Sequence, residues 1–288
     1  GCSNHCSYCA IPLIRGELAS RPFDDIVREC KHLIASGTYE LTLIGQDLGS
    51  YGKDSDSGHS LPKLLKALTA LEGDFVIRLL YIHPDHFPYE ILDIMEEDRR
   101  LLPYFDIPFQ HASGRILSAM NRKGNTETYL GLLKTIRARL PNAVIRSTFL
   151  TGFPGETEED FRELLEFQEK AQFDWLGAFT FSREEDTPAY SMKNRVRKSL
   201  SDERKKSIEI RQQSITEQKL TRYIGTEQTI LIEERIEETD LSIGRGYMQA
   251  PEVDGATVVV GSKAEAGETV RVRITAVRGI DLEGSILS

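Results

Sequence analysis

The chain has 288 residues, of which 40% are hydrophobic and 28% charged, so it is long enough to bury a full core and to divide into two domains. No apolar run approaches the roughly 18 residues that cross a bilayer and no signal-peptide pattern opens the chain, which disfavours membrane and export functions. The formal net charge of -9 opposes binding to a phosphate backbone and favours a basic protein partner.

The chain begins with three cysteines, Cys2, Cys6 and Cys9, in the spacing C-x3-C-x2-C. One loop with this spacing can offer a thiolate to three irons of a 4Fe-4S cluster and leave the fourth iron open. In radical enzymes, the amino and carboxylate groups of S-adenosylmethionine bind that iron, and electron transfer into the sulfonium yields the 5′-deoxyadenosyl radical. The spacing therefore predicts a radical S-adenosylmethionine enzyme.

A zinc site is the alternative, with His5 or His111 as weak candidates for a fourth ligand, but structural zinc sites usually pair two C-x2-C knuckles. Four cysteines are too few for a disulfide scaffold, which indicates a reducing cytoplasm. Cys30 lies on the apolar face of a predicted helix and is expected to pack as a small hydrophobic residue. Because the motif begins at Gly1, where natural domains are commonly disordered, we expect a piece of a longer protein.

Strands and helices alternate after the cysteine motif, beginning with a helix over Phe23–Ile34. The predicted strands are Leu41–Ile44, Phe75–Ile82, Tyr104–Phe109, Val144–Thr151 and Trp175–Phe181, and the helices between them are Leu61–Leu71, Tyr89–Glu97, Gly114–Asn121, Glu127–Leu140 and Glu158–Ala171. This alternation indicates an α/β fold with a parallel sheet. The segment is shorter than the roughly 250 residues of a complete eight-unit barrel, so we predict a partial (βα)6-type barrel whose first strand precedes Gly1.

Residues 201–222 are predicted to form a charged connecting helix, with Ser201 as its cap and Asp202 and Glu203 in its first turn. Beyond it, short alternating strands over residues 229–232, 257–260 and 269–275 predict a small all-β barrel. The predicted domains are therefore residues 1–200, a connector over 201–222, and residues 223–288.

The last segment is acidic, with 7 Lys and Arg against 12 Asp and Glu from Arg222 onward. A module that binds RNA normally has a basic face, so this charge favours a basic protein substrate, whose encounter it would speed. An ordinary solvated acidic surface is the alternative.

Four sequence blocks resemble the radical domain of the methylthiotransferase family. They are Gly1–Pro12 with Arg15-Gly16, Leu43–Asp47, Ile107–Ser113 and Thr151–Thr157. Within the family, His111-Ala112 after Gln110, Ser182–Ala189 and Gln249–Gly255 resemble the RimO type, whereas relatives that modify tRNA usually carry Ser-Gly after that glutamine. The resemblance covers nearly the whole chain, and its C-terminal part is similar to a TRAM domain.

The resemblance implies a radical S-adenosylmethionine methylthiotransferase that modifies the β-carbon of an aspartate in protein twelve of the small ribosomal subunit. It implies a reductant such as flavodoxin or ferredoxin, and a second 4Fe-4S cluster in an N-terminal domain of the full-length protein. A chain that begins at Gly1 is expected to keep the radical half of the reaction and to fail at sulfur insertion. Two alternatives stay open: a tRNA adenosine methylthiotransferase that binds RNA through the TRAM domain, and a non-catalytic fragment that binds a cluster or RNA.

Candidate cosubstrate residues follow the predicted strands, because parallel barrels place their chemistry at the carboxyl ends of strands. Gly45, Gln46 and Asp47 end one strand and, by the resemblance, receive the amino end of S-adenosylmethionine; a plain turn is the alternative. Gln110 ends another strand and is predicted to hydrogen-bond the ribose, whereas His111 caps the following helix. Arg146, inside an apolar strand, needs either a ligand carboxylate or a structural ion pair.

Further candidates lie in a turn and in the cysteine loop. Gly152 and Phe153 are predicted to approach the adenine, although turn chemistry alone also favours them. Tyr8, between two cluster ligands, is predicted to shield the cluster or touch the adenine, with aromatic packing as the alternative. Trp175, Phe179 and Phe181 are assigned to the core.

Overall fold

The computed structural model describes residues 1–287, which form two compact units. The first unit comprises residues 1–172 and 176–210, and the second comprises residues 173–175 and the chain from Arg211 onward. The chain passes from one to the other inside helix α8, Lys198–Leu220. The domain limits drawn from the sequence at residues 200 and 222 stay predictions. Among the described residues, no helix is long and apolar enough to cross a membrane.

The first unit is built on a row of strands. They are β1 (Glu40–Ile44), β2 (Val76–Leu80), β3 (Tyr104–Asp106), β4 (Val144–Thr151) and β5 (Trp175–Thr180). β1 pairs in parallel with β2, and β3 pairs in parallel with β4, which adjoins β5. A parallel bridge between Ile77 and Leu101 connects the two groups. The predicted alternation and the parallel pairing of these strands are confirmed.

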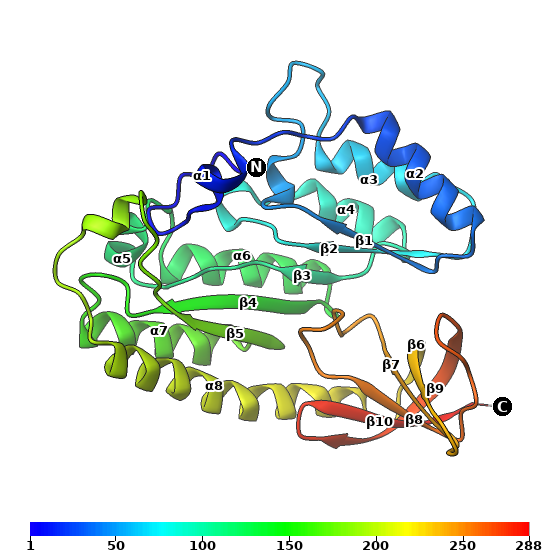
Figure 1. The fold of residues 1–288 in the computed structure, drawn as a ribbon. Helices are drawn as coiled ribbons and strands as arrows, with labels where there is room; N and C mark the ends of the chain where they lie inside the picture. Colours follow the sequence, from blue (N-terminus) through cyan, green and yellow to red (C-terminus); the bar gives the residue numbers. More distant parts are fainter. Residues whose placement is uncertain (288) are drawn as a thin grey trace. The chain divides into compact units, whose positions relative to one another are not determined.

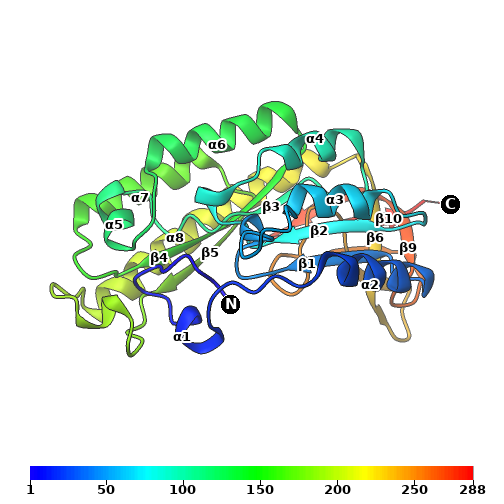
Figure 2. The same ribbon diagram turned by 90° about the horizontal axis from the view of Figure 1, so that it is seen from above.

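Helices cover this row on one face (Figures 1 and 2). Apart from the short α1 (Ile11–Arg15) beside the N-terminus, the helices are α2 (Phe23–Ala35), α3 (Leu61–Thr69), α4 (Glu90–Glu97), α5 (Gly114–Ala119), α6 (Thr126–Arg139) and α7 (Glu158–Ala171). They adjoin one another in the order α2, α3, α4, α6, α7. The buried leucines of α3 recur at helical spacing, at Leu61, Leu64, Leu65 and Leu68. Burial of each of these side chains stabilises the fold by roughly 1.5–3 kcal/mol.

Single residues of the first unit test the predictions from the sequence. Cys30 is buried in α2, as predicted for a structural cysteine. Phe179 is 57% exposed, so its assignment to the core is wrong. Side chains alternate along β5, so Phe179 lies on the face opposite Ala178, and this face is exposed at Phe179 although it is buried at Trp175. Trp175, which belongs to the second unit, is buried as predicted.

The predicted cap at Ser201 is also wrong, because α8 begins three residues earlier, at Lys198. The Ser201 hydroxyl donates to the Arg197 carbonyl at 3.3 Å, and the Ser201 carbonyl accepts from the Thr151 hydroxyl at 3.1 Å. Ser201 is therefore a buried contact between the helix and the end of β4 and does not start the helix.

The second unit contains a closed barrel with the strand order β10-β8-β7-β6-β9. Its strands are β6 (Glu227–Ile236), β7 (Leu241–Arg245), β8 (Thr257–Val260), β9 (Thr269–Arg278) and β10 (Asp281–Ile286). The predicted all-β barrel is confirmed, although the sequence analysis missed β7 and β10. Each of these two strands contains a glycine that interrupts the apolar alternation.

Close backbone approach explains both glycines. A Cβ at Gly244 would lie 2.3 Å from the Leu231 carbonyl oxygen, and one at Gly284 would lie 2.4 Å from a Val272 methyl group. Larger residues do not fit these positions, and a glycine within a strand is characteristic of such close contacts.

Candidate metal centre and active site

The N-terminal cysteine loop is held by backbone hydrogen bonds. The Cys2 amide donates to the Gly16 carbonyl at 3.1 Å, which closes the loop around α1. The Ser7 amide donates to Met120 at 3.0 Å, and the Ser7 carbonyl accepts from Ala189 at 2.8 Å. The loop is therefore fixed against the end of α5 and against residues far along the chain.

Cys2, Cys6 and Cys9 are free thiols. Cys6 is buried, and the Cys9 amide donates to the Cys6 carbonyl at 3.0 Å, so the second and third cysteines share one turn. Burial raises the pKa of the Cys9 thiol, and the neighbouring Cys6 and Cys2 sulfurs raise it further, because negative charges close together repel each other. Bound cations would relieve that repulsion.

The donor set fits a 4Fe-4S cluster better than a single ion. Among residues 1–287, no three His, Cys, Asp or Glu side chains are arranged to hold one metal ion. A cubane cluster instead takes each thiolate on a different iron, so its ligands surround it without converging on one point. The single-zinc alternative gains no support from the geometry of the described residues.

Asp47 connects the cysteine loop to the end of β1. Its carboxylate accepts from the Asn4 side chain at 3.1 Å, the Ser50 hydroxyl at 2.6 Å and the His86 ring at 2.7 Å. Burial would raise the pKa of Asp47, but these hydrogen bonds outweigh it and lower the pKa. The buried carboxylate therefore positions Asn4, whereas the adjoining Gly45 is half-buried and Gln46 is exposed.

Two cavities open beside the cysteine loop. The first, of about 480 Å³, is lined by Cys2 and Asp47 among others, and the second, of about 410 Å³, is lined by His83 and Arg122 among others. Ser3, Asn4 and His86 line both. These volumes fall within the range of small-molecule sites, roughly 300–1,000 Å³.

Arg122, which the sequence analysis missed, lies behind the loop. Its guanidinium is 3.9 Å from the Cys6 sulfur and 3.5 Å from the Tyr8 hydroxyl. Tyr8 itself packs against an apolar cluster that includes Met120 and Phe153, so its aromatic packing role is observed. No sequence pattern signals the contact of Arg122 with Cys6, because it joins residues 116 positions apart.

Gln110 occupies a left-handed backbone conformation with φ 68°, which is uncommon for a residue other than glycine. Its amide donates to the Thr148 carbonyl at 2.8 Å and its carbonyl accepts from Leu150 at 2.7 Å, in a parallel bridge to β4. The next residue, His111, accepts the backbone N–H groups of Ala112 and Ser113 through Nδ1 at 2.9 and 3.0 Å. These amides precede α5, whose N-cap is Ser113, so the capping role predicted for His111 is wrong. Burial lowers the pKa of His111 to about 3, so the ring is neutral at pH 7.

Arg146 has the ion pair that was one of its two predicted alternatives. Its Nη1 lies 3.0 Å from a carboxylate oxygen of Asp106 on the neighbouring strand β3. Burial raises the pKa of Asp106, and the arginine acts against that rise. Contact between Arg146 and a ligand carboxylate stays a prediction.

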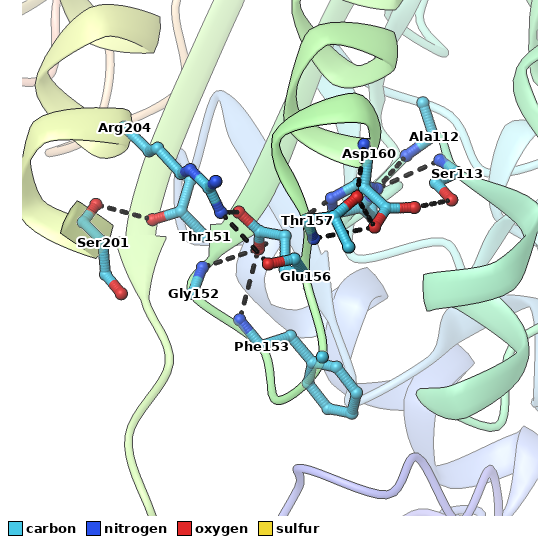
Figure 3. A network of polar contacts seen from close by, with 12 residues as sticks. Ala112, Ser113, Thr151, Gly152, Phe153, Glu156, Thr157, Asp160, Ser201 and Arg204 are labelled. Carbon is cyan, nitrogen blue, oxygen red and sulfur yellow. Dashed lines mark hydrogen bonds and ion pairs between the residues drawn. The ribbon is translucent and has the colours of Figure 1, made fainter. Parts of the chain in front are cut away.

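The turn after β4 belongs to a buried polar network (Figure 3). Glu156 accepts the Gly152 amide at 2.6 Å and the Phe153 amide at 3.2 Å, and its other oxygen pairs with Arg204 at 2.7 Å. Gly152 has φ 77°, and a Cβ there would lie 2.0 Å from the Ser201 hydroxyl oxygen. Glycine is therefore required at this position by the packing of α8.

Seven of the predicted site residues fall into three groups. Cys2 and Asp47 border the first cavity, and Tyr8 and Phe153 share one apolar cluster. Gln110, Arg146 and Gly152 lie along β4 or at its end. Phe153 is fully buried with its ring 5.6 Å from that of Phe181, so an approach of its side chain to adenine stays a prediction.

Family models match both units. The radical SAM superfamily model matches residues 1–167, and the TRAM domain model matches residues 224–287. The fold is similar to that of the radical S-adenosylmethionine methyltransferase TsrM from Kitasatospora setae, with a TM-score of 0.55 and 20% identity over 66% of this chain and 37% of that chain. It is also similar to coproporphyrinogen III oxidase HemN from Escherichia coli, with a TM-score of 0.52 and 17% identity over 73% of this chain and 50% of that chain.

Curated relatives match nearly the whole chain. The ribosomal protein uS12 methylthiotransferase RimO of Treponema denticola is 48% identical over 98% of this chain and 67% of its own length. Those of Syntrophomonas wolfei and Geobacter sulfurreducens are 43% and 41% identical over 99% and 100% of this chain, and over 65% of their own lengths. The chain thus spans about two-thirds of the length of these relatives. It belongs to the radical SAM superfamily and, within it, to the RimO family of ribosomal protein uS12 methylthiotransferases.

Proposed function

We propose that the protein is a radical S-adenosylmethionine methylthiotransferase that modifies the β-carbon of an aspartate in ribosomal protein uS12. The observation that carries this proposal is the cysteine loop of a chain of the RimO family: it contains three free thiols, and one of them, Cys2, lines a cavity of about 480 Å³. A cytoplasmic location accords with this substrate.

In this proposal Cys2, Cys6 and Cys9 hold a 4Fe-4S cluster. When bound, the cluster and S-adenosylmethionine supply the electron and the carbon-centred radical that removes hydrogen from an unactivated carbon. The protein's own contribution is positioning. Asp47 fixes Asn4 of the loop through a 3.1 Å hydrogen bond, and the same carboxylate accepts the His83 amide at 3.1 Å.

The remaining predicted residues would contact the cosubstrate from the strand ends. Gly45 and Gln46 follow β1, where their backbone would receive its amino end. The side chain of Gln110 would meet the ribose, and the backbone of Gly152 and Phe153, with Tyr8, would lie near the adenine. Arg146 would add a positive charge for a carboxylate while keeping its contact with Asp106.

Charge favours a protein substrate over RNA. The segment from Arg222 carries 7 Lys and Arg against 12 Asp and Glu, and Glu233, Glu234, Glu237 and Glu238 are all exposed at the end of β6. Ribosomal proteins are basic, so this acidic surface would attract uS12 and repel tRNA. Salt-sensitive binding to tRNA that is tighter than binding to uS12 would favour the tRNA-modifying alternative.

Partners and a second cluster complete the proposal. A low-potential electron donor such as flavodoxin or ferredoxin would reduce the cluster. The full-length protein would carry a second 4Fe-4S cluster for sulfur insertion, so residues 1–288 alone would form the radical without completing methylthiolation.

Anaerobic reconstitution tests the radical chemistry. Protein loaded with iron and sulfide is expected to form one 4Fe-4S cluster per chain and, with dithionite and S-adenosylmethionine, to release 5′-deoxyadenosine measured by chromatography. Cys9→Ala should abolish both, whereas the matched control Cys30→Ala should retain both, because Cys30 packs inside α2. A cluster-loaded protein that makes no 5′-deoxyadenosine would contradict the proposal.

A further inference from the structure

Arg122 is a buried arginine aimed at a predicted cluster ligand. It follows α5, and only 6% of its surface is exposed. Nη2 donates to the Pro108 carbonyl at 2.6 Å, while Nη1 faces the Tyr8 hydroxyl at 3.5 Å and the Cys6 sulfur at 3.9 Å. Since the guanidinium is planar and the Pro108 carbonyl holds one of its nitrogens, the other is directed at the cysteine loop.

The charge of Arg122 is poorly compensated within the described residues. Its acceptors are the Pro108 carbonyl, the phenols of Tyr8 and Tyr129 and the Cys6 thiol, and its Nε has no hydrogen-bond partner among residues 1–287. Asp85 acts on it more weakly than these phenols and the thiol do, and Asp85 also accepts the Lys123 amide at 3.0 Å. A buried cation is costly unless it is paired, which indicates that a negative charge is supplied from the cysteine loop.

We infer that Arg122 is a positioning residue whose charge is balanced by the iron-bound Cys6 thiolate, and that it raises the reduction potential of the cluster. This inference rests on the proposed function, because it requires the cluster to be bound by the three cysteines. The couple takes up one electron from a low-potential one-electron donor, and no bond or proton changes place. The added electron makes the cluster more negative, so a fixed cation beside it stabilises the reduced state more than the oxidised state.

The experiment measures the midpoint potential of the reconstituted cluster by redox titration with dithionite, followed by electron paramagnetic resonance. For Arg122→Met, the equilibrium constant for reduction is expected to fall at least tenfold, which is a shift of about 59 mV to more negative potential for a one-electron couple. Arg122→Lys keeps the positive charge, so its midpoint potential should stay closer to that of the parent. The matched control is Arg99→Gln, an exposed arginine just before the start of β3, which should leave the potential unchanged.

A second measurement separates the electrostatic role from a structural one. Without a cluster, Arg122 is a buried cation that forms no ion pair among residues 1–287, so cluster-free Arg122→Met should resist urea at least as well as the cluster-free parent. Arg122→Gln serves as a second neutral variant. If both neutral variants unfold where the cluster-free parent stays folded, Arg122 is a structural residue and the inference is wrong.

The potentials can also overturn the inference. The inference is wrong if the midpoint potential is unchanged in the neutral variants. It is also wrong if the potential shifts equally in Arg122→Met and Arg122→Lys. By contrast, a parent protein that binds no cluster at all contradicts the proposed function, so the two failures are distinguishable.

Discussion

Two buried arginines of the first unit, Arg122 and Arg204, are neutralised in different ways. Arg204 is 4% exposed and pairs with Glu156 at 2.7 Å and with Glu158 at 3.0 Å. Arg122 is 6% exposed but meets a carbonyl, two phenols and a thiol. Arg204 is therefore paired with carboxylates of the chain itself, whereas by our inference the charge of Arg122 is balanced at the cysteine loop.

This difference separates a structural part of the fold from a functional one. The Arg204 network ties α8 to the turn after β4 and needs no ligand (Figure 3). By our inference, the charge of Arg122 is balanced only when Cys6 binds iron as a thiolate. Loading with iron and sulfide should consequently change the effect of mutations around Arg122 but not the effect of mutations in the Arg204 network.

The largest effect is expected from breaking the paired arginine. Glu156→Gln keeps the acceptor for the Gly152 amide but removes the charge, so Arg204 is left buried with only the mostly exposed Glu158 as counter-ion. The free energy of unfolding should fall by about 3–5 kcal/mol, measured by urea denaturation. Glu158→Gln is the matched control and should cost less than about 1 kcal/mol. Equal losses of unfolding free energy in the two variants would show that the buried ion pair contributes no more to stability than the exposed one.

Removing both charges sharpens the comparison. In the double variant Glu156→Gln with Arg204→Met, no charge is left buried, so at least half of the lost stability should return. A double-mutant cycle in urea measures the coupling between the two side chains. Strictly additive losses would mean that the ion pair itself contributes nothing.

A smaller effect is expected where α5 meets α7. Asp160 accepts from the Ser113 hydroxyl at 2.7 Å and from the Thr157 amide at 2.8 Å, and it contacts Arg115. Burial would raise the pKa of Asp160, but these hydrogen bonds lower it to about 2 from 3.8. Asp160→Asn should therefore cost about 2 kcal/mol at pH 7, where the parent is fully ionised.

The pH dependence of that loss has a definite sign. Because the folded pKa lies below the unfolded one, the stabilisation by Asp160 is fully present above about pH 4 and is lost as the pH falls towards 2. The difference in the free energy of unfolding between the parent and Asp160→Asn, measured in urea, should thus narrow between about pH 4 and pH 2. Glu166→Gln, which removes an exposed charge from α7, is the control and should show no comparable narrowing. A stability difference that stays constant over this pH range would contradict the lowered pKa of Asp160.

Local patterns were sufficient for much of this protein. The spacing of Cys2, Cys6 and Cys9 depends only on neighbours along the chain, and so do the alternation of strands and helices and the sequence blocks of the RimO family. The acidic balance of the barrel is likewise a property of composition. Errors arose where a local signal was ambiguous: Ser201 had the composition of a cap but lies inside α8, and Gly244 and Gly284 concealed two barrel strands.

The amino-acid sequence by itself determined the type of ligand set, the parallel architecture and the family, because each is written in short-range spacing and periodicity. Only the tertiary structure decided which side chains surround that ligand set. Asn4 meets Asp47 across 43 residues, Arg204 meets Glu156 across 48, and Arg122 meets Cys6 across 116. Charge compensation depends on distance in space, and the chain order of these residues does not encode that distance until the strands and helices have packed.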